Sequence, residues 1–191
     1  MFRFKNIAEK DLLKIYAWKE HEIQNSDKKK FIVRNIPKTD LVMPHDSYLI
    51  GLSSLQIEGY PTPELTGMQV IDASSSRFHT IFNLYPDKDN DNQLQMLKDK
   101  KYLKSYEKAF DKIFNLEGDD SDFEVRSIKI PALHVEALWL HKEHDEGSDK
   151  FKPIRSMGLF EENKMYDRED FFNILKTASE NFDLGDDLIG G

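Results

Sequence analysis

Residues Phe123 to Leu140, FEVRSIKIPALHVEALWL, are the densest apolar segment in this sequence of 191 residues. Turn-prone acidic segments border it on both sides: EGDDSD precedes it and HKEHDEGSD follows it. An apolar run between such borders is typical of a buried strand or a short buried helix. Because Pro131 lacks an amide hydrogen and disfavours helix at the residue before it, we expect Phe123–Ile130 to be extended.

Two structures are open for the second half of this segment, residues 131–140. A proline suits the first position of a helix, so a helix that begins at Pro131 is one of them. The alternation of Val135, Ala137 and Trp139 with their neighbours favours the other, an edge strand. In both cases we expect the whole segment to lie in the hydrophobic core.

The composition indicates a folded protein rather than a disordered one. The chain is 39% hydrophobic and 12% aromatic, and its length suits one domain with a sizeable core. No run approaches the roughly 20 apolar residues of a membrane helix, and the first residues lack the apolar stretch of a signal peptide. We therefore expect a cytoplasmic protein that does not contact a membrane. The absence of cysteine excludes disulfides, thiolate metal sites and thiol nucleophiles.

The net charge of −8 is unevenly distributed along the chain. Residues 117–191 carry 9 Lys and Arg against 19 Asp and Glu, a net charge of −10. An acidic surface repels nucleic-acid phosphates, so we expect no nucleic-acid partner. The basic cluster Lys28–Lys30 with Arg34 has no interleaved aromatic ladder, and it is predicted to be a solvated loop.

Hydrophobic periodicity predicts helices and strands that do not alternate strictly. Apolar residues at three- and four-residue spacing predict three helices, over 7–24, 92–115 and 166–182. Alternating or short apolar runs predict strands at 31–36, 47–57, 68–72, 77–84 and 151–154, in addition to the central segment. The expected fold class is α+β, with a largely antiparallel sheet packed by about three helices. We expect a single globular domain over 1–182 and an acidic, flexible tail over 183–191.

Two details of the helices can be predicted from the same pattern. In the first helix, Leu12, Ile15, Tyr16 and Ile23 fall near one face, which we expect to pack on the core. Asp167 is the expected N-cap of the last helix, because an aspartate at that position accepts a hydrogen bond from a free amide of the first turn.

One group of carboxylates has the spacing of a calcium loop. Asp87, Asp89 and Asp91 match the first, third and fifth positions of such a loop. Asn92 replaces the glycine needed at the sixth position, and Lys98 replaces the final carboxylate. We therefore expect a polar loop here rather than a calcium site.

A second polar group has the residue types of a zinc site. The candidate metal ligands are His141, His144 and Asp145, with His134 upstream. The surrounding residues are charged and supply no apolar shell, so we expect a solvated hairpin tip without a metal or other cofactor.

Ser74, Ser75, Ser76 and His79 are candidates for a nucleophile and its base. No strand–GxSxG–helix elbow surrounds these serines, and the sequence has no GxGxxG or GxxxxGK[ST] phosphate loop. A serine-rich turn between two strands accounts for them, so we expect no enzymatic activity.

The last residues of the sequence carry a double glycine, Gly190-Gly191, preceded by Leu188 and Leu184. Glycines can thread a narrow protease cleft in extended form because they have no side chain. This segment resembles the double-glycine leader of precursors of ribosomally made, post-translationally modified peptides. Gly185 departs from the family pattern, which usually has an apolar residue there.

The resemblance implies a non-enzymatic recognition domain, the folded leader portion of such a precursor. Its partners would be peptide-modifying enzymes and a peptidase that cuts after Gly191, and its recognition residues would be Leu184, Leu188, Gly190 and Gly191. One alternative is an immunity or regulatory module of the cytoplasm, whose acidic surface binds a basic partner protein. A second alternative is a metal-dependent enzyme that uses the histidine group.

Overall fold

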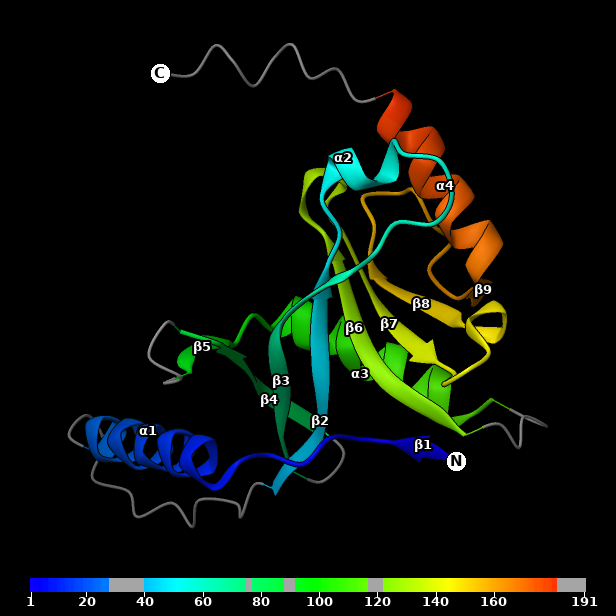
Figure 1. Ribbon diagram of the computed structural model, residues 1–191. Helices are drawn as coiled ribbons and strands as arrows, with labels where there is room; N and C mark the ends of the chain where they lie inside the picture. The colour runs from blue at the N-terminus through cyan, green and yellow to red at the C-terminus, as the bar shows by residue number, and fades with distance from the viewer. Residues whose placement is uncertain (28–39, 75–76, 88–91, 117–121, 182–191) are drawn as a thin grey trace, which may run out of the picture. The chain divides into compact units, whose positions relative to one another are not determined.

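The apolar segment folds as two antiparallel strands in the computed structural model (Figure 1). Strand β6 comprises Phe123–Ile130, and strand β7 comprises Val135–His141. Between them, Pro131–Leu133 forms one 3-10 turn that begins at the proline, and His134 closes it in the left-handed conformation with φ of 51°. Residues 131–140 therefore contain both of the structures that the sequence left open, a helical turn followed by a strand.

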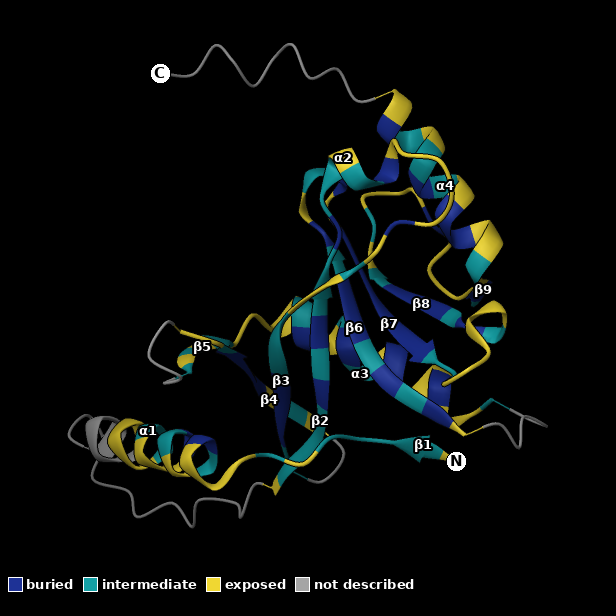
Figure 2. Cartoon of the chain, viewed as in Figure 1, coloured by how far each residue is buried: buried dark blue, intermediate teal, exposed yellow. Residues whose placement is uncertain are grey.

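Strand β7 lies inside the sheet and not at its edge. It pairs with β6 on one side and with β8 (Lys150–Arg155) on the other. Every residue from Val135 to Leu140 is buried, and only His141 is half-buried (Figure 2). The expectation of an edge strand is wrong, because a strand that is covered on both faces needs no alternation of apolar and polar residues.

The structure describes residues 1–27, 40–74, 77–87, 92–116 and 122–181. The chain divides into two compact units whose segments interleave along the sequence. Unit 1 comprises Met1–Arg3, Ser47–Leu65 and Lys108–Gly191, and unit 2 comprises Phe4–Asp46 and Thr66–Glu107.

Unit 1 contains the central strands and most of the chain that follows them. Its strand order is β2-β6-β7-β8-β9, and β1 pairs with β6 in parallel. The remaining bounds are Phe2–Arg3 for β1, Asp40–Leu49 for β2, Leu52–Leu55 for α2, Tyr166–Asp167 for β9 and Arg168–Glu180 for α4. Strand β2 belongs to unit 2 up to Asp46 and to unit 1 from Ser47 onward.

Aromatic rings form the core of unit 1 where α4 packs on the sheet. Phe171 of α4 stacks on Phe151 of β8, with ring centroids 4.2 Å apart and planes only 4° from parallel. Phe160 stacks on the same Phe171 ring at 4.9 Å. Asp167 caps α4 as the sequence predicts, because its side chain accepts a 2.8 Å hydrogen bond from the amide of Asp170.

Unit 2 combines α1 with an antiparallel group of strands in the order β5-β4-β3-β2. The bounds are Glu9–Asp27 for α1, Glu64–Ser74 for β3, Arg77–Tyr85 for β4 and Gln93–Leu97 for β5. Its fully buried apolar residues cluster around Ile15, Val70, Phe82 and Leu84.

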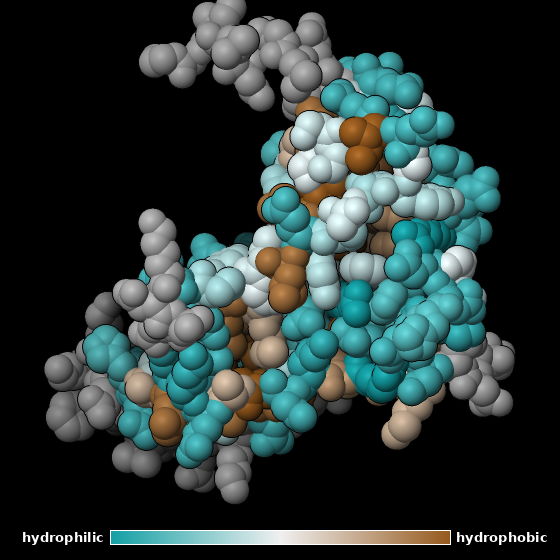
Figure 3. Space-filling model, viewed as in Figure 1, coloured by the Kyte–Doolittle hydropathy of each residue, from teal (hydrophilic) through white to brown (hydrophobic). Residues whose placement is uncertain are grey.

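Helix α1 turns a narrower apolar face toward this core than its sequence suggests. Ile15 is fully buried, and Trp18 packs against the same cluster. Tyr16 is 48% exposed, so the prediction that it faces the core is wrong. The viewed surface of α1 is mostly hydrophilic (Figure 3), which agrees with its many charged residues. The side chain of Ile23 lies outside the described part of the chain.

The helix predicted over 92–115 begins too early. Gln93–Leu97 is strand β5, and α3 comprises only Lys100–Phe114, after Asp99, whose side chain accepts a hydrogen bond from an amide of the first turn. Pairing between β5 and β4 overrides the helical spacing, because the partner residues lie in the preceding strand, outside the window that shows this spacing. The predicted inner face of the helix is confirmed, since its buried residues include Leu103, Tyr106, Phe110 and Ile113.

Most of the other predicted helices and strands occur in the structure. The strands at 68–72, 77–84 and 151–154 and the helices near 7–24 and 166–182 are confirmed. The strand predicted at 47–57 is right only at its start, because Leu52–Leu55 is the short helix α2. The strand predicted at 31–36 lies outside the described residues.

The α+β fold class with a largely antiparallel sheet is therefore confirmed. Four α-helices occur in the described ranges, and three of them are the predicted long ones. None of the helices in the described ranges is long and apolar enough to cross a membrane. The boundary between domain and tail at residue 182 is not described and stays a prediction.

Gly67 gives a sharp test of the β3–β4 pairing in unit 2. Its φ is +151°, and a Cβ atom there would lie 2.1 Å from the carbonyl oxygen of Leu84. Gly67→Ala is expected to lower the free energy of unfolding by about 2 kcal/mol or more, from strain and from the clash with backbone. Urea unfolding monitored by circular dichroism measures this.

The matched control is Gly51→Ala. Gly51 has φ of −72°, and its Cβ would meet nothing closer than 3.9 Å. We expect a change within about 0.5 kcal/mol. Equal losses in the two variants would contradict the close approach of Gly67 to β4.

Candidate functional site

A row of side chains crosses three strands of unit 1 on one face of the sheet. Arg126 of β6 lies opposite Trp139 of β7, which lies opposite Phe151 of β8. Residues directly opposite one another in antiparallel strands project to the same face. The Arg126 guanidinium sits 4.8 Å from the Trp139 ring, a cation–π contact, and the Trp139 and Phe151 rings stack at 6.0 Å.

A buried carboxylate fixes the end of this row. Asp149 is 1% exposed and accepts three hydrogen bonds: from Trp139 Nε1 at 2.8 Å, from His141 Nδ1 at 3.2 Å and from the amide of Lys142 at 3.0 Å. A buried carboxylate requires such donors to stay charged. The contact with Asp149 places the Nδ1 proton of His141, so Nε2 is the ring nitrogen left for other partners.

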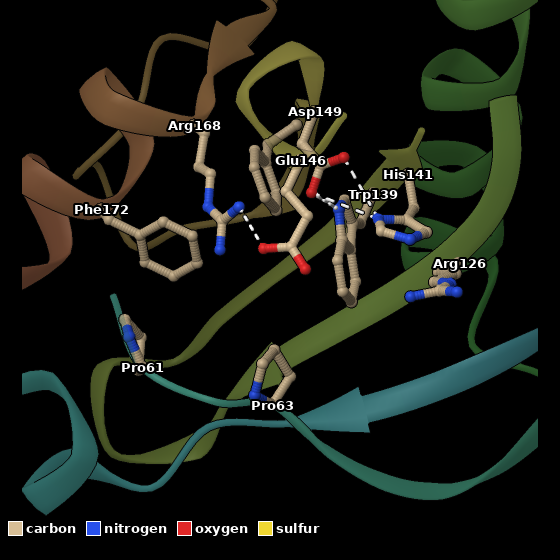
Figure 4. Close-up of a pocket in the computed structure, with 10 residues that line it drawn as sticks. Pro61, Pro63, Arg126, Trp139, His141, Glu146, Asp149, Arg168 and Phe172 are labelled. Carbon is tan, nitrogen blue, oxygen red and sulfur yellow. Dashed lines mark hydrogen bonds and ion pairs between the residues drawn. The ribbon is translucent and has the colours of Figure 1, made fainter. Parts of the chain in front are cut away.

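These side chains line a cavity of about 140 Å³ (Figure 4). Further walls come from Pro61 and Pro63, which lie before β3, and from Phe172 of α4. Arg168, the first residue of α4, and Glu146, in the connection between β7 and β8, complete the lining. All ten lining residues belong to unit 1.

Arg168 and Glu146 form an ion pair at this cavity. Arg168 Nη1 donates to Glu146 Oε2 at 2.5 Å (Figure 4). The Arg168 side chain is 20% exposed, and its guanidinium also lies 4.6 Å from the Tyr60 ring. The Glu146 side chain is 61% exposed, so one partner of this ion pair, Arg168, is mostly buried and the other is accessible to solvent.

The cations around Glu146 favour its charged form. The hydrogen bond from Arg168, followed by the charge of that guanidinium, lowers the pKa of Glu146, and His141 and Arg126 act in the same direction. Desolvation opposes them without reversing the shift. Glu146 therefore remains a carboxylate at neutral pH, and its contact with Arg168 is lost only as the pH falls through this lowered pKa.

An arginine N–H donor of the cavity has no hydrogen-bond partner among the described residues. This donor is the Nε atom of Arg168, which is buried. Arg126 donates through Nε to Glu124 at 2.8 Å. With its proton on Nδ1, His141 presents Nε2 as an acceptor, so the remaining donors of the lining come from its two arginines.

The candidate metal ligands do not come together. His141 binds Asp149, whereas the His144 side chain is 91% exposed and lies 3.8 Å from Glu143. Asp145 pairs with Lys142, and His134 closes the turn between β6 and β7. Where the structure describes the chain, no group of three or more His, Asp or Glu side chains is arranged to hold a metal ion.

The remaining candidates are placed as follows. Ser74 Oγ lies 2.5 Å from His79 Nε2, an exposed pair at the β3–β4 hairpin of unit 2. Asp87 accepts a hydrogen bond from Gln93 at 3.1 Å. The other members of the serine and calcium groups, Ser75, Ser76, Asp89 and Asp91, lie outside the described residues. The same holds for Leu184, Leu188, Gly190 and Gly191.

Sequence reasoning missed the members of the cavity other than His141. One signal was present: Trp139 and His141 are two residues apart in β7, so they project to one face of that strand. Comparisons with known proteins found no matching family model, curated protein or solved structure.

Asp149→Asn tests the network beneath the cavity. The amide replaces an acceptor-only group by one with its own protons, so it cannot accept all three hydrogen bonds, and we expect a loss of about 2–3 kcal/mol in the free energy of unfolding. The indole N–H resonance of Trp139 should move in a ¹H–¹⁵N spectrum, while that of Trp18 stays in place.

Asp145→Asn is the matched control, because it makes the same chemical change in the same connection. Asp145 contacts Ser148 and Lys142 at the surface. Its variant should keep the wild-type stability and the wild-type Trp139 resonance. A Trp139 resonance that Asp149→Asn leaves unmoved would rule out the hydrogen bond between them.

Proposed function

We propose that this chain is a cytoplasmic binding domain that recognises a protein partner through the cavity of unit 1, and that it acts by binding rather than by catalysis. The observation that carries the proposal is the buried Asp149 carboxylate, whose hydrogen bonds hold the side chains of Trp139 and His141 in place. Groups fixed before binding lose little conformational entropy when a ligand arrives.

The size and chemistry of the cavity support recognition of a small group. At about 140 Å³ it is smaller than the roughly 300–1,000 Å³ of cavities that enclose whole cofactors or drug-sized ligands. It suits one side chain or a fragment of similar size. Its ten lining residues include no serine, threonine, cysteine or lysine, and its acidic side chains, Glu146 and Asp149, already accept hydrogen bonds from neighbouring residues.

Exposed apolar residues next to the cavity fit a partner larger than the group inside it. Tyr60 is 47% exposed, and its ring contacts both Phe172 and Arg168 of the cavity wall. Ile57, on the same segment, is 55% exposed. Aromatic side chains beside a desolvated pocket are typical of the centres of protein interfaces.

A panel of small compounds tests the proposal. Propionate, propionamide, propylammonium and toluene are each titrated into ¹⁵N-labelled protein, and we expect at least one to shift the Trp139 indole resonance in a saturable way. Trp18 belongs to unit 2 and is the internal control. Saturation at Trp18 alone, or at neither indole, would count against this cavity as the binding site.

The leader hypothesis is a more specific form of the same proposal. It is supported by the resemblance of Leu184, Leu188, Gly190 and Gly191 to a double-glycine leader, in which case the partners are modifying enzymes and a processing peptidase. The alternative, an immunity or regulatory module, is supported by the acidic composition of residues 117–191.

Extension of the chain beyond Gly191 separates these two forms. With a short peptide appended, a double-glycine peptidase should release that peptide by cutting after Gly191, and the change Gly190→Val in the same extended chain should block the cut because a side chain cannot enter the narrow cleft. Mass spectrometry gives the cleavage site. An extended chain that the peptidase leaves intact would favour the interaction module.

A further inference from the structure

We propose that the cavity of unit 1 binds a carboxylate group, and that Glu146 occupies the place of that group until the ligand displaces it. This inference rests on the proposed function, because it names the chemical class of the ligand for the same cavity. The evidence is the ion pair between Arg168 and Glu146, the second arginine in the same lining, the accessibility of Glu146 and the size of the cavity.

The cations select an anion. Two arginines, Arg168 and Arg126, line the cavity together with Glu146, and Arg168 donates a hydrogen bond to the Glu146 carboxylate. Arginine next to an apolar wall is well suited to a carboxylate, because its planar guanidinium offers several donors in a fixed geometry. A ligand cation at the same place would meet like charges from both arginines.

The other carboxylate of the cavity does not compete for these cations. Both oxygens of Asp149 are engaged by Trp139, His141 and Lys142. The Glu146 carboxylate, in contrast, is paired with Arg168 and is 61% exposed on the β7–β8 connection. Rotation of the Glu146 side chain toward solvent would leave Arg168 with a buried Nε and an open Nη1.

The Glu146 side chain indicates the size and charge of the ligand group that fits the cavity. Its side chain extends toward Arg168 at the cavity of about 140 Å³ (Figure 4). The carboxylate of a partner's aspartate or glutamate, or of a short free acid, has the same charge and shape. A whole dinucleotide or a large aromatic acid would not fit in this volume.

Competition by Glu146 predicts how the affinity for a carboxylate ligand changes when this side chain is replaced. A ligand that binds only when Glu146 has left shows an affinity reduced by the fraction of molecules in which it has left. Glu146→Gln removes the competing charge, so propionate should bind this variant about fivefold or more tightly than wild type. The dissociation constant is read from the Trp139 indole resonance.

Glu143→Gln is the matched control. Glu143 lies on the same connection, is also 61% exposed and loses the same charge, but its partner is Arg3. Its affinity for propionate should stay within about twofold of wild type. Adding Arg168→Gln to Glu146→Gln should abolish the gain, because the principal cation is then missing.

Uncharged and peptide probes complete the experiment. Propionamide has the shape of propionate without its charge, and equal binding of the two would overturn the carboxylate inference. Acetyl-Gly-Glu-Gly-amide compared with free propionate identifies the source: tighter binding of the peptide indicates a partner's acidic side chain, and tighter binding of propionate indicates a small acid.

The outcomes also separate this inference from the proposed function. Saturable binding of propylammonium or toluene at Trp139, without propionate binding, would keep the cavity as a binding site and overturn the carboxylate class. Propionate affinities that are equal in wild type and Glu146→Gln would overturn the competition by Glu146. No binding of any probe to either protein would overturn both proposals.

Discussion

The arrangement of the cavity depends on one buried charge, the carboxylate of Asp149. Burial of an ionised group costs several kcal/mol unless hydrogen bonds replace its water. Here the three replacements come from an indole, an imidazole and a backbone amide, all within the β7–β8 hairpin. Because each donor must point at the same carboxylate, this requirement fixes the ring of Trp139, the ring of His141 and the start of the connection together.

The consequences extend outward from that carboxylate. The face of Trp139 contacts the guanidinium of Arg126, which also donates to Glu124. Phe151 stacks on Trp139 and on Phe171, and so continues the row of rings to α4. The row across β6, β7 and β8 thus joins a hydrophobic core at one end to a charged cavity at the other. A cavity on such a base can be rigid even though the connection that supplies Glu146 is exposed.

The fold class could be predicted because several helix and strand ends are determined by residues close in sequence. Pro131 predicted the end of an extended run, and Asp167 predicted a helix start. The helix predicted at residues 93–97 is wrong because the spacing of their apolar residues fits both the helical and the strand period. Only the pairing with β4 selects the strand. The edge-strand prediction for 135–140 failed because a sequence does not state how many neighbours a strand will have.

The cavity could not be predicted for a related reason. Its residues come from the segment before β3, from β6, β7 and β8, and from α4, so no window of sequence contains the set. Asp149 looked like one of several acidic residues in a polar turn. Its distinction from Asp145, four residues earlier, is burial, and burial arises only when the hairpin has closed.

The interleaving of the two units has a consequence for how the chain is made. The last residue of unit 2 is Glu107, whereas unit 1 combines Met1–Arg3 and Ser47–Leu65 with residues that follow Glu107. On the ribosome, unit 2 is therefore complete first, and Phe2 waits for Phe123 to emerge before β1 can pair with β6. No single cut of the gene yields either unit as a continuous fragment.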